Sequence, residues 1–236
     1  MESEEAPPEV SGAGRRLQAG QLIDGFRLEE HLHQGGMAHL WRVTRVDEPD
    51  GPPLIMKVPR IKGGDDPATI VGFEVEQMIM PTLSGPHVPR YVAKGDFTRQ
   101  PYIVMEHIPG ASLRARFDAA PLPLDEVVQV GIKVATALHD LHRQHVIHLD
   151  VKPSNIMFRR NSDGTQGEAV LVDFGLSRHD RLPDLLDEEF ELPMGTGPYM
   201  SPEQVQFVRN DARSDLFALG VLMYHLATGE RPFGNP

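Results

Sequence analysis

The feature that most constrains the fold is a polar segment at residues 148–155, followed by a second polar segment that begins at Asp173. The first segment carries Asp150, Lys152 and Asn155 at short fixed spacing, and its proline excludes a regular helix there. Between the two segments, short apolar runs flank a polar stretch around Gly164, which predicts a β-hairpin. With its turn centred near Gly164, the hairpin places Asn155 opposite Asp173.

These two segments contain groups that phosphoryl transfer requires: an aspartate base, a lysine, and an Asn/Asp pair with oxygen ligands for Mg²⁺. The spacing D-x-K-P-x-N with Asp173-Phe174-Gly175 after it resembles the catalytic and magnesium-binding loops of eukaryotic-type (Hanks-type) protein Ser/Thr kinases. The resemblance covers residues 22–236. It implies an α+β, protein-kinase-like bilobal fold, in which a small β-rich N-lobe with helix C precedes a mainly helical C-lobe.

Composition is compatible with one large or two-lobed domain, because the chain has 236 residues and 40% of them are hydrophobic. The absence of cysteine excludes disulfides and thiolate metal sites and fits a reducing cytoplasm. A net charge of −11 argues against nucleic-acid binding. The acidic amino terminus lacks the apolar core of a signal peptide, and the best apolar run, residues 217–227, is too short to span a bilayer.

The pattern divides the chain into a tail and one domain. Residues 1–20 are rich in Glu, Pro, Gly and Ala and predict a disordered tail. Residues 21–236 predict the kinase domain, with the N-lobe over about 21–106 and the C-lobe over about 111–236. Because complete kinase domains continue through further helices, we expect this domain to be truncated after helix F, with an exposed apolar flank.

A glycine-rich loop is expected early in the N-lobe. Residues 32–41 resemble the kinase loop that covers the phosphates of ATP, where Gly35 and Gly36 let backbone N–H groups approach the nucleotide. His33 and Ala38 replace the first and third glycines of the family pattern. The geometry of this loop is therefore expected to differ from the family's.

The carboxylate partner of Lys57 follows from helix geometry. By resemblance, Lys57 lies on the third kinase strand and reaches the α/β phosphates. Residues 70–80 predict a helix, in which each residue turns by about 100°. Glu76 then shares the apolar face with Phe73, whereas Glu74 points roughly 160° away from Glu76. An unpaired carboxylate on that face would be costly, so Glu76 is predicted to pair with Lys57 and Glu74 to face solvent.

The adenine pocket is implied by the resemblance. Residues 102–110 resemble the fifth strand and the hinge, with Met105 as gatekeeper and the backbone of Glu106 and Ile108 as adenine partners. Ile55 stands where the family usually has alanine, which predicts a narrow or shifted adenine slot. The residues expected around ATP are Gly35, Gly36, Leu40, Ile55, Lys57, Met105, Glu106, Ile108 and Met157.

In the C-lobe, apolar spacing predicts a helix that Asp125 caps and that runs to about His145. His148 is expected to pack beneath the catalytic loop. Asp215 resembles the helix-F aspartate that ties this loop down. The helix after Asp215 is apolar nearly all round, which indicates a buried central helix.

The resemblance also assigns roles in catalysis. Residues 195–203 resemble the end of a Ser/Thr kinase activation segment, and residues 35–37 and 199–204 favour the bacterial branch. The expected cofactors are ATP and Mg²⁺, and the expected partners are proteins that present Ser or Thr; a regulatory partner is left open. The catalytic residues are predicted to be Asp150, Lys152, Lys57, Glu76 and Thr196, and the metal ligands Asn155 and Asp173.

Two departures from the family pattern point in the same direction. Leu149 replaces the arginine that usually binds an activation-loop phosphate, and residues 178–194 contain no Ser, Thr or Tyr. We therefore predict a kinase of the non-RD type that activation-loop phosphorylation does not control. The acidic residues nearby could imitate a phosphate, but Leu149 offers them no charge, so a solvated loop is expected instead; these residues are Asp184, Asp187, Glu188, Glu189 and Glu191.

Two other functions stay open. A pseudokinase would use the fold as a nucleotide-binding scaffold without catalysis. It is favoured by the family departures and by the predicted truncation, but opposed by the complete set of catalytic residue types. A small-molecule phosphotransferase with a related lobe is opposed by the sequence of residues 152–155 and 196–203.

Overall fold

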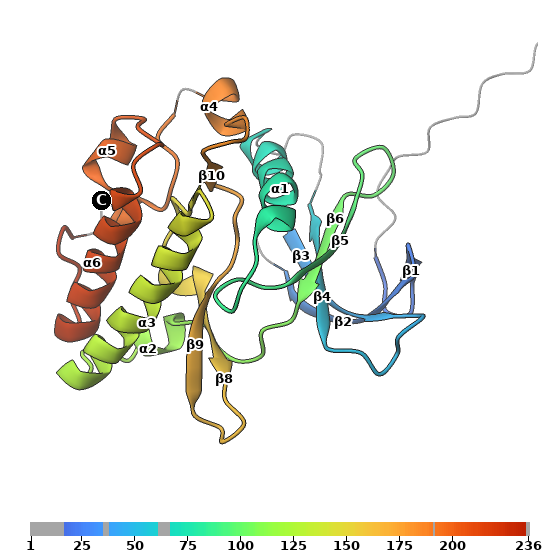
Figure 1. The fold of residues 1–236 in the computed structure, drawn as a ribbon, viewed down its shortest axis with the longest axis horizontal. Helices are drawn as coiled ribbons and strands as arrows, with labels where there is room; N and C mark the ends of the chain where they lie inside the picture. The colour runs from blue at the N-terminus through green and yellow to red at the C-terminus, as the bar shows by residue number, and fades with distance from the viewer. Residues whose placement is uncertain (1–16, 35–37, 61–66, 191, 235–236) are drawn as a thin grey trace, which may run out of the picture.

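The structure is a computed structural model that describes residues 17–34, 38–60, 67–190 and 192–234. In this part of the chain two lobes lie side by side, one built on the main β-sheet and the other containing most of the helices (Figure 1). The predicted bilobal α+β architecture is therefore confirmed. Residues 1–16 of the predicted tail lie outside the described residues.

The main sheet of the N-lobe is antiparallel and has the strand order β1-β2-β3-β4-β6-β5. Alternation along β4 buries Leu54, Met56 and Val58 against one core and turns Lys57 to the opposite face. The strands described in this sheet are β1 (Leu22–Ile23), β2 (Phe26–Gln34), β3 (Ala38–Arg45), β4 (Leu54–Pro59), β5 (Tyr91–Gly95) and β6 (Tyr102–Glu106).

Helix α1 (Pro67–Ile79) lies beside the sheet and contacts β4 (Figure 1). It begins before residue 70, where the periodicity predicted its start, because a proline fits the first turn of a helix. At the other end a 3₁₀ turn over Met80–Thr82 follows it. Its buried face contains Phe73 and Glu76, as the periodicity predicted, and Glu74 is half-buried rather than fully exposed.

In the C-lobe, α3 and α6 pack against each other and form the centre of the larger core (Figure 1). The helices described here are α2 (Arg114–Phe117), α3 (Leu124–Arg143), α4 (Leu185–Glu189), α5 (Pro202–Val205) and α6 (Arg213–Thr228). The strands are β7 (Val146–Ile147) paired with β10 (Arg178–His179), and β8 (Ile156–Arg160) paired with β9 (Gln166–Leu171).

The predicted bounds of α3 need correction. Asp125 does not cap it, because the helix begins one residue earlier, and Pro123 occupies the N-cap position. Asp125 lies in the first turn, where a negative charge interacts favourably with the helix dipole. The helix ends at Arg143, and His145 has already left it with a φ of 65°.

Helix α6 has two different sides. Ser214, Asp215 and Leu222 are buried, whereas Leu216 and Tyr224 are about half exposed. The helix is therefore packed in the core on one side only, and Leu216 and Tyr224 form the exposed apolar flank that the sequence led us to expect. Across the described ranges, none of the helices combines the length and the apolar character needed to cross a membrane.

The α3 core provides a test of this packing. Leu138→Ala should lower the free energy of unfolding by roughly 2–5 kcal/mol, because the fully buried side chain would leave a cavity between packed helices. Val128→Ala is the matched control: its side chain is half exposed on the same helix, and its cost should stay within about 0.5 kcal/mol. Urea denaturation compares the two, and equal costs would contradict the packing.

Candidate active site

The β8–β9 hairpin brings the two polar segments together. Its register pairs Ile156 with Leu171, and the Val172 N–H donates to the Asn155 carbonyl at 3.0 Å. Asn155 therefore lies opposite Val172, one residue before Asp173, which corrects the predicted pairing. The shift arises because the turn is centred on Asp163 rather than Gly164: Arg160 pairs with Gln166, and the Asn161 N–H donates to the Thr165 carbonyl. A register irregularity between Phe158 and Arg160 then moves the pairing by one residue toward Asp173, which offsets the difference only in part.

A buried carboxylate holds the catalytic loop. Asp215 accepts hydrogen bonds from the backbone N–H of His148 at 2.9 Å and of Leu149 at 2.8 Å, and His142 Nε2 lies 2.8 Å from it. Leu149 adopts φ 60°, a region that residues with a Cβ rarely occupy. The bonds to Asp215 therefore fix a loop conformation that the local sequence alone disfavours.

His148 packs below this loop, as the sequence predicted. Its side chain is fully buried, its ring centre lies 5.2 Å from that of Phe174, and its Nε2 lies 3.2 Å from the Val172 carbonyl. The Asp150 N–H donates to Nδ1 at 3.3 Å, which leaves Nε2 as the donor to Val172. The histidine thus joins the catalytic loop to the chain just before Asp173.

Asp150 lies at the centre of a polar network. Thr196 Oγ1 donates to one carboxylate oxygen at 2.6 Å, and Lys152 Nζ donates to the other at 2.6 Å. Lys152 also reaches Thr196 at 3.1 Å, and the Asn155 amide donates to Asp150 Oδ2 at 3.1 Å. Three residues predicted from two separate motifs therefore meet around the Asp150 carboxylate.

Lys57 lies between two carboxylates. Its Nζ is 2.5 Å from Glu76 and 2.9 Å from Asp173, so the predicted pairing with Glu76 is present. Burial disfavours the charge on Lys57, but Asp173 and Glu76 together raise its pKa above the ordinary lysine value. The Lys57 charge lowers the pKa of Asp173 to about 2, whereas burial raises the pKa of Glu76 and Lys57 offsets this only in part. Asp173 is therefore ionised at neutral pH.

The residues predicted around adenine lie on adjacent strands. Ile55 pairs with Met105 across β4 and β6, and Leu40 pairs with Lys57 across β3 and β4. Ile108 is buried, and within the described residues its backbone N–H has no hydrogen-bond partner. The Met157 side chain is half-buried on β8. Gly35 and Gly36 lie outside the described residues.

At the hinge, by contrast, the Glu106 N–H is already occupied, because it donates to the Arg90 carbonyl at 2.9 Å. The Glu106 side chain forms an ion pair with Arg159 of β8, a contact that the sequence did not indicate. Burial would raise the pKa of Glu106, but Arg159 and the Arg90 N–H lower it below the ordinary value. The pair connects the hinge to the catalytic hairpin.

Gln204 belongs to the segment 199–204 that indicated the bacterial branch, but the sequence assigned it no structural role. Its side chain donates to the Leu149 carbonyl at 2.8 Å and to the Met194 carbonyl at 3.3 Å, so it joins the catalytic loop to the activation segment. Ser201 and Gln204 also form a capping box at the start of α5. The S-x-x-Q spacing is a sequence signal for that arrangement and could have identified it.

The acidic stretch of the activation segment is not uniformly solvated. Asp187, Glu188 and Glu189 are exposed as predicted, and Glu191 lies outside the described residues. Asp184 departs from the prediction: its carboxylate lies 3.0 Å from Arg209 and 3.3 Å from Arg178. The cations that pair with Asp184 are thus Arg209 and Arg178, and position 149 contributes none.

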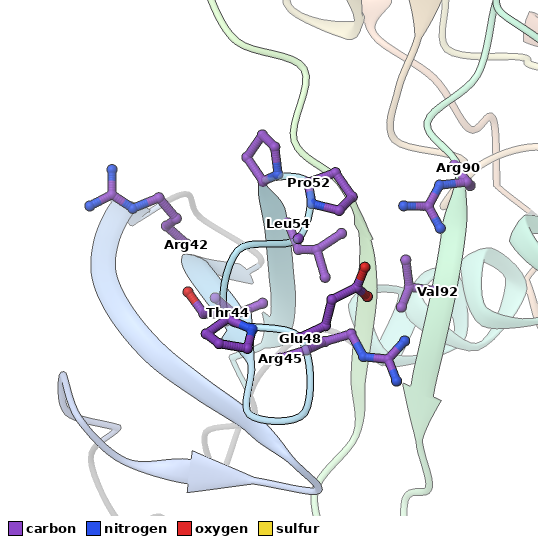
Figure 2. Close-up of a pocket in the computed structure, with 12 residues that line it drawn as sticks. Arg42, Thr44, Arg45, Glu48, Pro52, Leu54, Arg90 and Val92 are labelled. Atoms are coloured by element: carbon purple, nitrogen blue, oxygen red, sulfur yellow. The ribbon is translucent and has the colours of Figure 1, made fainter.

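One hollow on the described surface lies away from this network. Its volume is about 200 Å³, and it opens at the edge of the N-lobe (Figure 2). Arg42, Thr44 and Arg45 approach it from β3, Val92 from β5, and Arg90 from the residue just before β5. None of the predicted catalytic or metal-binding residues lines it.

A kinase-like fold with these two converging networks defines the class of protein. Residues 29–236 match the sequence model of the Protein kinase domain family, and the chain belongs to this family. The family uses ATP and a divalent metal ion in general.

Several curated relatives come from bacteria. A probable serine/threonine-protein kinase PknB of Lactococcus lactis is 30% identical over 220 residues, which is 92% of this chain and 34% of that protein. Serine/threonine-protein kinase PknL of Mycobacterium tuberculosis is 33% identical over 226 residues, 94% of this chain and 54% of the relative. PknB of Mycobacterium leprae is 32% identical over 220 residues, covering 90% and 34%. The chain thus spans from about a third to about half of the length of these relatives.

The role of Asp215 can be tested with an isosteric change. Asp215→Asn should destabilise the fold by about 1–3 kcal/mol, because an amide NH₂ would face buried N–H donors that now meet carboxylate oxygens. Asp118→Asn removes the charge of an exposed ion pair with Arg114 and should cost no more than about 0.5 kcal/mol. Denaturant midpoints measure both, and a stable Asp215→Asn variant would contradict the assignment.

Proposed function

We propose that this chain is the catalytic domain of a protein serine/threonine kinase that transfers the γ-phosphoryl group of ATP to Ser or Thr hydroxyls. The observation that carries the proposal is the network around Asp150, in which Lys152 and Thr196 each lie 2.6 Å from a separate carboxylate oxygen. Such a network positions a base, a cation and a substrate-facing loop together. The names of the bacterial relatives support the same activity.

In this proposal, each side chain near Asp150 has a defined task. Asp150 accepts or steers the proton of the substrate hydroxyl, and the Thr196 and Lys152 bonds hold its carboxylate in one orientation. Lys152 supplies positive charge for the transferring phosphoryl group. Thr196 links the activation segment to the base, so that an ordered segment and a correctly oriented base occur together.

Lys57 and Glu76 orient the nucleotide in this mechanism. Lys57 binds the α/β phosphates, and the buried Glu76 restricts where its ammonium group lies. The free N–H of Ile108 can donate to the adenine edge, together with the Glu106 carbonyl. Leu40, Ile55, Met105 and Met157 form the apolar walls of the proposed adenine site, and Gly35 and Gly36 are proposed to cover the phosphates.

Asn155 and Asp173 fit a magnesium site. Asp173 is ionised and about half exposed, and Asn155 lies directly across the hairpin from the residue before it. A carboxylate and an amide oxygen are ligands that Mg²⁺ accepts beside phosphate oxygens and water. The bound ion would neutralise phosphate charge during transfer.

A pseudokinase is the main alternative. Ile55 and Leu149 depart from the family pattern at described positions, yet neither departure separates the polar groups of the site, since Lys57, Asp150 and Asp173 all keep their partners. We therefore favour catalysis over a pseudokinase.

We also propose that residues 21–236 form the kinase domain, with lobes at about 21–106 and 111–236. Its proposed location is the cytoplasm, where ATP is available.

The kinase is proposed to be of the non-RD type and independent of activation-loop phosphorylation. Leu149 is buried, with its N–H on Asp215 and its carbonyl on Gln204, so position 149 presents no cation to a phosphate. Residues 178–194 contain no hydroxyl side chain that a kinase could modify. Position 149 thus lacks the arginine that usually binds the phosphate, and residues 178–194 lack the hydroxyl groups that usually carry it.

Loss of the base should separate binding from transfer. Asp150→Asn should lower kcat by about 10²- to 10⁴-fold, because the amide cannot accept the hydroxyl proton, while ATP affinity stays within a few-fold. The assay uses labelled ATP, Mg²⁺ and a generic basic protein, with phosphoamino-acid analysis. Asp163→Asn, at the exposed hairpin tip, is the control and should retain full activity. A wild-type protein that binds ATP without transfer would instead establish the pseudokinase.

Removal of phosphate should leave the enzyme active. We expect phosphatase-treated protein, checked by mass spectrometry to carry no phosphate between Asp173 and Glu203, to keep the initial rate of the untreated protein. The physical reason is that position 149 offers no charge for a phosphate to bind. A rate that falls on treatment and recovers after autophosphorylation in this segment would contradict the prediction.

A further inference from the structure

Asp184 connects three elements of the C-lobe: strand β10, helix α4 and the segment between α5 and α6. One carboxylate oxygen, Oδ2, lies 3.0 Å from Arg209 Nε and 3.3 Å from Arg178 Nε. The other, Oδ1, accepts the N–H of Asp187 at 3.4 Å, so that Asp184 also caps α4. Arg178 lies on β10, and Arg209 lies in the segment between α5 and α6.

The ion pair with Arg209 is largely removed from solvent. The side chains of Arg209 and Asp184 are 9% and 12% exposed, whereas the side chain of Arg178 is 27% exposed. A guanidinium buried to this extent needs an anion, because an unpaired charge in such a place is strongly unfavourable. Arg209 also donates to the Leu176 carbonyl at 3.1 Å, just after Gly175. Arg209 therefore holds the activation segment at two points, the Leu176 carbonyl and the Asp184 carboxylate.

Helix α4, which begins after Asp184, packs on α1 (Figure 1). Its Leu186 is fully buried and belongs to the same core cluster as Phe73 of α1. Because α1 also carries Glu76, the position of α4 bears directly on the Lys57–Glu76 pair. A chain of contacts thus runs from Arg209 through Asp184 and α4 to the lysine proposed to hold ATP.

We propose that Asp184 is a positioning residue whose permanent negative charge orders the activation segment and holds α4 against α1, in place of a phosphate. Phosphates order such segments by binding arginine side chains. Here the carboxylate of Asp184 meets two arginines without any modification. The proposal rests on the proposed kinase function for its effect on rate, but the ordering itself is independent of catalysis.

The test isolates the charge of Asp184 from its shape. Asp184→Asn keeps the size and an oxygen that can cap α4, but it leaves Arg209 and Arg178 without an anion. We expect kcat to fall by about 5- to 150-fold, the range typical of coupling between separate sites, with the KM for ATP raised less. Asp187→Asn is the matched control, because Asp187 lies in the same helix with an exposed side chain, and its rate should be unchanged.

Two further variants separate positioning from general damage. Asp184→Glu keeps the charge and should recover most of the lost rate. In a double-mutant cycle, Arg209→Gln combined with Asp184→Asn should cost little more than Asp184→Asn alone, because the two side chains act through each other. Independent, multiplicative losses would overturn the proposal.

Hydrogen exchange measured by mass spectrometry provides a readout that needs no activity. In Asp184→Asn, peptides covering α4 and α1 should lose protection, while peptides covering α3 keep it; in Asp187→Asn all three should match the wild type. If the wild type transfers no phosphoryl group, but Asp184→Asn still loses protection in α4 and α1 relative to the wild type, the proposed function fails and the proposed role of Asp184 stands. Unchanged protection of α4 and α1 in Asp184→Asn would overturn the anchor even in an active kinase.

Discussion

The catalytic loop of this protein depends on one buried carboxylate, that of Asp215. The catalytic loop follows the short strand β7 and has no regular backbone pairing of its own. Within it, Leu149 occupies a left-handed conformation that costs on the order of 1–3 kcal/mol. Two charge-assisted hydrogen bonds from the backbone to Asp215 offset that cost and fix the direction in which the next residue, Asp150, leaves the loop. The geometry of the whole site therefore originates in helix α6, which lies outside it.

Lys57 performs the corresponding task between the lobes. It comes from the N-lobe sheet, and its two carboxylate partners come from α1 and from the segment after β9. One cation between two carboxylates is well stabilised, whereas either carboxylate alone near buried apolar groups would be costly. The position of α1 and the conformation of the Asp173 segment are thus coupled through a single ammonium group, so a displacement of α1 alters both.

Periodicity and motif spacing predicted those parts of the site in which the partners are set by local geometry. The choice of Glu76 over Glu74 needed only the helical repeat, and the two-lobed fold followed from the resemblance. The pairing of Asn155 with Asp173 was wrong by one residue, because the exact turn centre at Asp163 and the bulge in β8–β9 leave no clear sequence signal. The ion pairs of Asp184 with Arg209 and of Glu106 with Arg159 were not predicted at all, since tertiary packing alone brings together residues 25 and 53 positions apart.

The chemistry of Asp184 differs from that of a phosphate in a way that affects control. A phosphate brings a charge of about −1.5 to −2 and three acceptor oxygens, and it can be added and removed. A carboxylate brings one charge and two oxygens, and here both oxygens are already engaged, one by arginines and one by the cap of α4. Such an anchor orders the segment permanently. Under this proposal, a switch would act on the contacts of α1 and α4 rather than on the charge of the activation segment.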